Sequence, residues 1–265
     1  MVKKSIDIVK WESTHHFEME IKRLELNKIE DDLAQKELEL ATLQGELYAF
    51  EIKYLRMVGV YFAELDDIRA KIAGALARLH VEDETLQEEA ERARTQARES
   101  AEASEAARLA RESILAPFNP SAELKTRFRD LAKRIHPDYG RDEEDRLRRH
   151  QWMAEANAAY RSGDASRLQA IIREWEEHLN SVSNDAITQL QQMIQKISQV
   201  KDRLRIIKIT IKQLRNSDIS QLKERAEEDE KDGEDLFLKM SDQLQREIIE
   251  ERARLSEILQ RSSHP

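Results

Sequence analysis

The stretch Leu26–Tyr61, LNKIEDDLAQKELELATLQGELYAFEIKYLRMVGVY, carries the pattern from which the rest of the architecture follows. Its apolar residues recur at alternating steps of three and four, and only Lys36 breaks the register. A period of about 3.5 residues over this length is typical of a coiled-coil seam. The seam consists of Leu26, Ile29, Leu33, Lys36, Leu40, Leu43, Leu47, Phe50, Tyr54, Met57 and Tyr61. We therefore expect a long helix that packs on other helices along one narrow face.

The helical pattern continues beyond this stretch, first in a shifted register and then with smaller residues. The step of four from Tyr61 to Leu65 is a stutter, which is expected to unwind a supercoil locally. Over residues 82–113 alanine dominates the apolar face, amid Glu and Arg. Two interpretations stay open there: a closely packed small-residue seam, or a solvated single helix stabilised by Glu–Arg pairs. Residues 15–116 are thus expected to form an N-terminal coiled-coil arm, on the order of 140 Å long as one helix.

A second coiled-coil pattern defines a C-terminal arm, residues 179–265. It contains a stammer at Ile197-Val200-Leu204, and Asn216-Ser217-Asp218 and Asp232-Gly233 weaken the helix. In the simplest single chain, the second arm folds back along the first and leaves the intervening segment at the tip. A homodimer satisfies the same seams, and the pattern does not choose between the two arrangements.

The composition agrees with long helices and excludes several classes of site. Charged residues make up 37% of the 265 residues and aromatic residues 5%, which favours helices with narrow seams over a sheet. The net charge of −9 argues against broad binding of nucleic-acid phosphates. Cysteine is absent, so disulfides, thiolate metal sites and cysteine nucleophiles are excluded.

No segment of the sequence resembles a membrane span or a secretory signal. The longest uninterrupted apolar run, Met57–Ala63, is far shorter than the ~20 residues that span a bilayer. The basic N-terminus is not followed by an apolar core and a cleavage site. The sequence therefore predicts a cytoplasmic protein without membrane association.

Residues 117–178 form a different unit, which begins where Pro117 and Pro120 interrupt the helical pattern. From residue 121 the sequence reads SAELKTRFRDLAKRIHPDY, with apolar residues at helical spacing. Pro137 lacks a backbone N–H and disfavours a helical conformation for the residue before it. The helix is therefore expected to end near His136, followed by a stiff loop.

Two further helices are expected after this loop. The acidic residues from Asp142 to Glu144 suit a helix N-terminus electrostatically. Gly163 is well placed to end that helix, and Asp164 to cap the next one.

The helix before the loop is cationic within an acidic chain. It carries five basic and two acidic side chains, a net charge of +3. Lys125, Arg129 and Lys133 are spaced by four and form a slowly winding stripe. Such a stripe attracts an acidic partner surface, and salt weakens the attraction.

These residues resemble the J domain of DnaJ-type co-chaperones. The family pattern is a basic helix ending in Leu-Ala, a few residues, His-Pro-Asp, and a second helix with an Ala-Tyr pair that packs back on the first. The matching pieces here are Leu131-Ala132, His136-Pro137-Asp138 and Ala159-Tyr160. The resemblance covers about residues 117–178, and the arrangement as a whole looks like divergent bacterial J proteins with coiled-coil arms.

The resemblance implies a binding role rather than an enzymatic one. In this family the loop and the basic helix dock on a DnaK-type heat-shock chaperone and stimulate its ATP hydrolysis. Asp138 would accept a charge-assisted bond from a partner Arg, with Pro137 holding the acceptor in place. The partner-binding residues so implied are His136, Pro137, Asp138, Lys125, Arg129, Phe128, Lys133 and Arg134. No catalytic residue, metal or cofactor is expected.

Some residues depart from the family pattern. Asp130 and Tyr139 stand where basic residues are frequent in the family. The family's first helix is not recognisable, and Ile114, Leu115 and Phe118 are expected to take its place. The expected fold is all-α, a small J-domain helical hairpin inserted between two long coiled-coil arms that bind a client, localise the protein or form oligomers.

Other functions explain the sequence less well. The main alternative is a coiled-coil scaffold whose J-like segment recruits partners but no longer stimulates ATP hydrolysis. Nucleic-acid binding by the basic helix is disfavoured by the acidic flanks. His15 and His16 are interpreted as solvated residues rather than a metal site, because adjacent side chains on one helix diverge.

Overall fold

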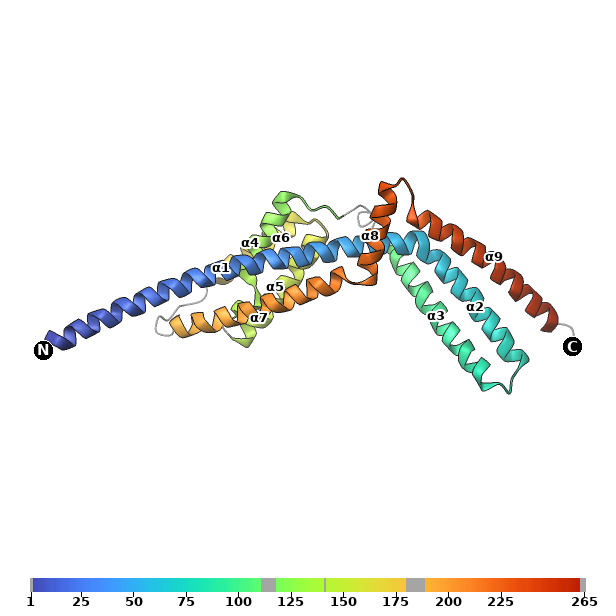
Figure 1. Ribbon diagram of the computed structural model, residues 1–265, viewed down its shortest axis with the longest axis horizontal. Coiled ribbons are helices and arrows are strands. Elements are labelled where there is room, and N and C mark those ends of the chain that lie inside the picture. The colour runs from blue at the N-terminus through green and yellow to red at the C-terminus, as the bar shows by residue number, and fades with distance from the viewer. Residues whose placement is uncertain (1, 111–117, 141, 180–188, 263–265) are drawn as a thin grey trace. The chain divides into compact units, whose positions relative to one another are not determined.

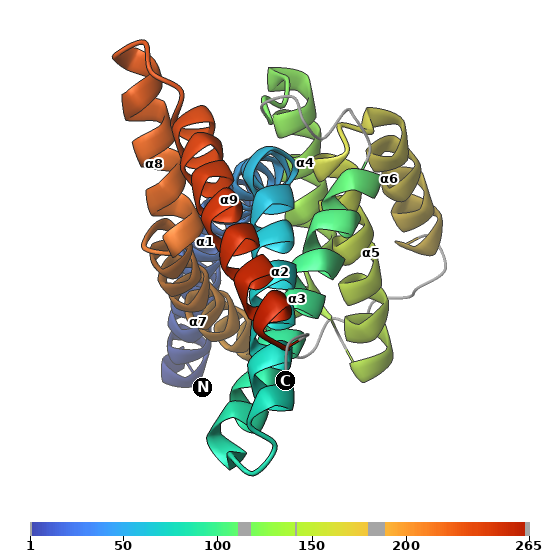
Figure 2. The same cartoon turned by 90° about the vertical axis from the view of Figure 1, so that its right-hand side faces the viewer.

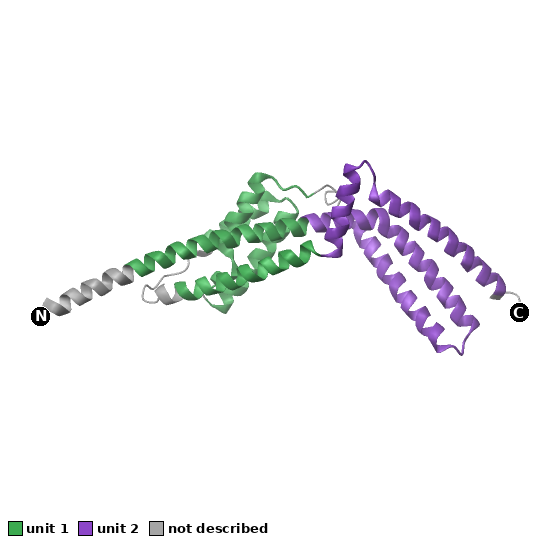
Figure 3. Cartoon of the chain, in the orientation of Figure 1, with its two compact units in different colours: residues 1–45, 118–216 green, residues 46–117, 217–265 purple. Residues whose placement is uncertain are grey.

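The computed structural model describes residues 2–110, 118–140, 142–179 and 189–262, and its regular elements there are all helical (Figure 1). This confirms the all-α class. The chain divides into two compact units (Figure 3). Unit 1 contains Met1–Gly45 and Phe118–Asn216, and unit 2 contains Glu46–Pro117 and Ser217–Pro265.

The elements follow one another in this order: α1 (Val2–Tyr54), the π-helical turn η1 (Leu55–Gly59), α2 (Val60–Leu79), α3 (Glu84–Leu109), α4 (Ala122–Ile135), the 3₁₀ turn η3 (Pro137–Tyr139), α5 (Glu143–Arg161), α6 (Ala165–Leu179), α7 (Gln189–Arg215), α8 (Asp218–Lys231) and α9 (Leu236–Ser262).

In unit 1, α1 pairs with α7 along the predicted seams. Their shared core consists of Leu33, Leu40, Val200, Leu204, Ile207 and Ile211. Ion pairs join Lys196 to Glu30 and Arg203 to Glu37, so sequence number rises in the same direction on both helices. The expectation that the second arm folds back along the first is therefore wrong for α7, which runs parallel to α1. A hydrophobic seam specifies an apolar face, and it is satisfied by a partner of either direction.

The three helices α4, α5 and α6 pack on the side of α1 around a second core of unit 1. This core contains Leu124, Phe128, Leu131, Ile135, Met153, Tyr160, Leu168, Ile171 and Trp175. Leu38 and Ala41 of α1 complete it, and Phe118 packs against it from the entering chain. Of the three residues predicted to take the place of a first helix, Phe118 packs against this core, and Ile114 and Leu115 lie outside the described residues. The contribution of α1 to this core was not predicted from the sequence.

Helix ends in unit 1 lie where the sequence predicts them. The Ser121 hydroxyl accepts from the Leu124 N–H and starts α4, and an Asp142 carboxylate oxygen accepts from the Asp145 N–H and starts α5. Gly163 has φ 71°, the left-handed conformation that glycine adopts most easily after a helix. An Asp164 carboxylate oxygen then accepts from the Arg167 N–H in the first turn of α6.

In unit 2, α2 lies between α3 and α9 (Figure 2). The expected single helix over residues 15–116 is wrong, because α2 ends at Leu79 and α3 returns antiparallel to it. The reversal is stabilised by Asp83, whose carboxylate accepts from the Thr85 and Leu86 N–H groups. Ala90 and Ala107 are buried, which supports the small-residue seam over the solvated helix. Ion pairs such as Arg92–Glu88 lie on its exposed face.

The change of register in the first seam corresponds to a change of helix type. The π-helical turn at Leu55–Gly59 lies just before the stutter. There Arg56 donates to the carbonyl oxygens of Ala107 at 2.6 Å and Arg108 at 3.2 Å, at the C-terminal end of α3. These bonds satisfy carbonyl groups that a helix end leaves without partners.

Helix α9 packs parallel to α2, on the side of α2 that α3 leaves free. Phe237, Leu244 and Ile248 pack against Val58, Leu65, Ile68 and Ile72. The breaks before α8 and α9 lie at Asn216-Ser217 and Asp232-Gly233, as predicted. Across the residues that the structure describes, none of the helices is apolar over a length sufficient to cross a membrane.

Candidate functional site

The candidate site is the turn that joins α4 to α5 in unit 1. Helix α4 ends at Ile135 because Pro137 cannot donate to a continuing helix. The Tyr139 N–H then donates to the His136 carbonyl at 3.0 Å, and the Gly140 N–H donates to the Pro137 carbonyl at 3.0 Å. These bonds close η3 and give the loop one defined conformation.

His136 lies beneath the loop, and only 2% of it is exposed. Its Nδ1 accepts from the Asp138 N–H at 3.2 Å, so Nε2 carries the hydrogen in the neutral ring. Nε2 lies 3.0 Å from Oε1 of Glu37 on α1 and donates to it. The imidazole therefore joins the loop to α1.

Glu37 is the centre of a buried polar network. The Arg203 guanidinium of α7 donates to the same Oε1, from Nη2 at 2.9 Å and from Nε at 3.1 Å. Burial alone would raise the pKa of the Glu37 carboxyl, but the His136 hydrogen bond and the Arg203 charge lower it below its ordinary value. Glu37 is thus ionised at neutral pH and links α1, the loop and α7.

Tyr139 contacts the same two helices. Its ring packs against the core that α1 and α7 share, and Lys196 Nζ of α7 lies 4.3 Å from the ring centroid. Burial raises the pKa of the Tyr139 hydroxyl, and nearby carboxylates add to the effect. Its aromatic side chain therefore anchors the loop to α1 and α7.

Asp138 has a different environment from its neighbours. Its Oδ2 is buried without a hydrogen-bond partner and lies 3.6 Å from His136 Nδ1. The residue lines a cavity of about 610 Å³ between the loop, the start of α5 and α7, which Arg146, Asp202 and Arg203 also line. Of the three loop residues, Asp138 thus offers a carboxylate beside an open cavity.

The predicted basic contact residues are divided between the surface and internal contacts. Arg129 is exposed and Lys125 is partly exposed on α4. Lys133 pairs with Asp31 of α1 at 2.6 Å, and Arg134 pairs with Glu176 of α6 at 2.9 Å. Phe128 is fully buried, so its side chain supports α4 from the core rather than facing a partner.

Arg149 on α5 is a structural residue of the site that sequence reasoning missed. It is buried, pairs with Asp145 at 3.1 Å and donates to the Arg134 carbonyl at 3.0 Å. Its guanidinium also lies 4.3 Å from the Trp175 ring centroid. Arg149 thereby ties the end of α4 to α5 and α6. Like Glu37 and Arg203, it has the sequence appearance of a solvated helix residue.

Gly140 brings the loop close to the backbone of α5. A Cβ at this position would lie 2.8 Å from Arg146 Cα and 2.9 Å from Arg146 N. We expect Gly140→Ala to displace the loop and lower the free energy of unfolding by about 1–3 kcal/mol, measured by urea denaturation. Gly74→Ala is the control: Gly74 lies inside α2, a Cβ there meets only ordinary contacts with Arg94 and Arg78, and the variant should be neutral or more stable. Equal stabilities of the two variants would contradict this prediction.

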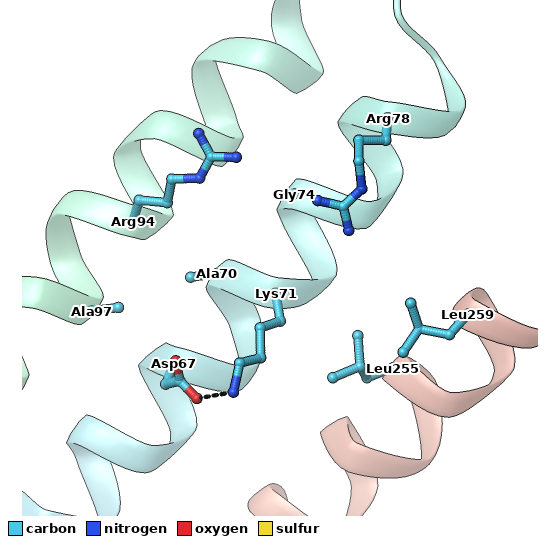
Figure 4. A pocket seen from close by; sticks show the side chains of 9 residues that line it. All are labelled: Asp67, Ala70, Lys71, Gly74, Arg78, Arg94, Ala97, Leu255 and Leu259. Carbon is cyan, nitrogen blue, oxygen red and sulfur yellow. Dashed lines mark hydrogen bonds and ion pairs between the residues drawn. The ribbon is translucent and has the colours of Figure 1, made fainter. Parts of the chain in front are cut away.

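A second cavity, of about 430 Å³, lies in unit 2 between α2, α3 and α9 (Figure 4). It is lined by Lys71, Arg78 and Arg94 together with Leu255 and Leu259. Lys71 pairs with Asp67 at 2.6 Å, and Arg94 pairs with Glu91. Much of its positive charge is therefore satisfied within the unit.

No cluster of three or more metal-ligating side chains occurs among the residues that the structure describes. The side chains of His15 and His16 lie outside that part of the chain. Comparisons of the chain with protein-family models, with curated proteins and with solved structures found no match.

Proposed function

We propose that α4, η3 and α5 are the working part of a J domain, and that the protein is a co-chaperone which stimulates ATP hydrolysis by a DnaK-type chaperone. The observation that carries the proposal is the hairpin itself. A cationic helix ends in His136-Pro137-Asp138, and Tyr160 of the returning helix packs on Phe128 with ring centroids 4.6 Å apart. This arrangement matches the order and the packing that the family resemblance implies.

The proposed contact surface consists of Asp138 and the exposed part of the α4 stripe. The Asp138 side chain lines an open cavity and is 28% exposed, although its Oδ2, which has no hydrogen-bond partner, is itself buried. It would accept a charge-assisted bond from a partner Arg, while Lys125 and Arg129 would meet acidic groups. Association is then expected to weaken as salt rises.

The arms supply the second half of the proposal. Toward the N-terminus of α1, three exposed apolar residues share one face of the helix, at Phe17, Ile21 and Leu24. Ile206 and Ile209 are exposed on α7. These faces are the proposed positions at which the arms bind a client or another coiled coil.

The test is single-turnover ATP hydrolysis by a DnaK-type chaperone with and without the protein. Asp138→Asn removes the charged acceptor, and Lys125→Glu with Arg129→Glu reverses the stripe. We expect each change to reduce the stimulation at least tenfold, since each removes about 1.5–3 kcal/mol of charge-assisted bonding.

Lys208→Glu is the matched control for charge reversal, because Lys208 is exposed on α7 of the same unit. It should stimulate as the wild type does. The co-chaperone proposal would be overturned if the wild-type protein gave no stimulation at any concentration in low salt. The exception is stimulation by a variant whose loop has lost its contacts with α1 and α7.

A coiled-coil scaffold without ATPase stimulation is the second candidate. The observation that favours it is the burial of His136 against Glu37, which gives the loop an internal structural role. This candidate predicts partner binding through residues 20–80 or 185–260 that survives Asp138→Asn. It also predicts no stimulation by the wild type or by any variant.

A further inference from the structure

The loop of unit 1 is held from its inner side by acidic and apolar groups of the same chain. We propose that α1 and α7 mask the His136–Tyr139 loop, and that the loop must separate from Glu37 and α7 before it engages an acidic partner surface. This inference rests on the proposed function, because it concerns the regulation of that same loop.

Helix α1 places acidic side chains against the basic stripe and the loop. Asp31 pairs with Lys133 of the basic stripe at 2.6 Å, and Glu37 accepts from His136 at 3.0 Å. Both side chains are carboxylates, and they lie against the stripe and the loop. Carboxylates are also the groups that the positive charge of α4 attracts on a partner. The acidic face of α1 therefore competes directly with an acidic partner for Lys133 and His136.

Helix α7 also holds the loop in place. Arg203 neutralises Glu37, so the carboxylate stays buried while it holds the imidazole. Tyr139 packs on the α1–α7 core beneath Lys196. A partner that contacts the inner face of the loop must displace these groups.

The hairpin of α4 and α5 has its own contacts with α1, apart from those of the loop. Leu38 and Ala41 of α1 belong to the hydrophobic core of α4, α5 and α6, and Thr42 is 2.9 Å from the Tyr160 hydroxyl. This part of α1 stays with the hairpin. The mask of the loop is polar apart from the Tyr139 ring, so the loop can move away from Glu37 and from the facing turns of α7 without unfolding the hairpin.

The test combines hydrogen exchange with ATPase titration on the full chain. Glu37→Ala removes the shared acceptor, and Tyr139→Ala removes the anchoring ring. In both variants the amides of Asp138, Tyr139 and Gly140 should exchange faster, while those of α5 keep their protection. If the loop is open in about one wild-type molecule in ten, release lowers the half-maximal concentration for stimulation about tenfold and leaves the maximal rate unchanged.

Glu39→Ala is the matched control, because Glu39 makes an ion pair between α1 and α7 with Arg215 at 2.8 Å and none with the loop. It should leave loop exchange and the half-maximal concentration as in the wild type. Two results overturn the mask: unchanged loop exchange in both test variants, or faster exchange with an unchanged half-maximal concentration. Faster exchange without stimulation by any protein overturns the proposed function instead, and with it the role of the mask.

Discussion

Replacing Phe128 by alanine is expected to lower the free energy of unfolding of unit 1 by about 3–5 kcal/mol, the cost of removing a large ring from a packed core. The side chain is 0% exposed and lies at the centre of the core that α4, α5, α6 and α1 share. Its ring centroid is 4.6 Å from that of Tyr160, and this contact aligns α4 with α5. The measurement is urea denaturation followed by circular dichroism, with hydrogen exchange to locate the loss in α4–α6.

The control for this variant is Leu147→Ala on α5, where the residue is 58% exposed. It removes an apolar side chain that contributes little to the core, and we expect a change within about 0.5 kcal/mol. Loss of the hairpin should also abolish any ATPase stimulation, because the loop depends on both helices. A Phe128→Ala protein as stable as Leu147→Ala would refute the assignment of this core.

Replacing Phe237 by alanine is expected to destabilise unit 2 by a similar amount, about 3–5 kcal/mol. Phe237 is buried at the start of α9, with its ring centroid 5.4 Å from Phe50 and 6.0 Å from Tyr54. Lys53 Nζ lies 5.4 Å from the same ring. Loss of this cluster should release α9, so its amides are expected to exchange faster in a hydrogen-exchange experiment.

The neighbouring residue gives the control for the second variant. Leu238 follows Phe237 on α9 but is 60% exposed, and Leu238→Ala should change stability by no more than about 0.5 kcal/mol. Because unit 1 has its own core, the amides of α4 and α5 should keep their protection in Phe237→Ala. Equal loss of protection in α4 would show that the two units unfold together.

Local structure was largely predictable from the sequence. The steps of three and four in the first seam mark the face of α1 that is buried against α7 and, further along, against α9. Pro137, Gly163, Asp142 and Asp164 end or begin helices as predicted, because each acts through its own backbone or a near neighbour. These effects need no knowledge of distant parts of the chain.

The candidate site was predictable only in part. The sequence placed His136 and Asp138 in a stiff turn after a basic helix, and that turn is present. It did not indicate that His136 is buried, since its hydrogen-bond partner Glu37 and the Arg203 that pairs with Glu37 are separated from it by 99 and 67 positions in the chain. In the sequence, both look like ordinary charged residues beside a coiled-coil seam.

The order of residues was enough to establish the helices, their apolar faces, their ends and the His136-Pro137-Asp138 turn, because periodicity, proline geometry and capping act over a few residues. Three-dimensional packing was needed to show that α3 reverses, that α7 runs parallel to α1, and that Glu37 and Tyr139 hold the turn from within. An apolar seam accepts any partner of matching shape, in either direction. Partner choice therefore depends on the summed packing of residues far apart in the chain, which no local pattern contains.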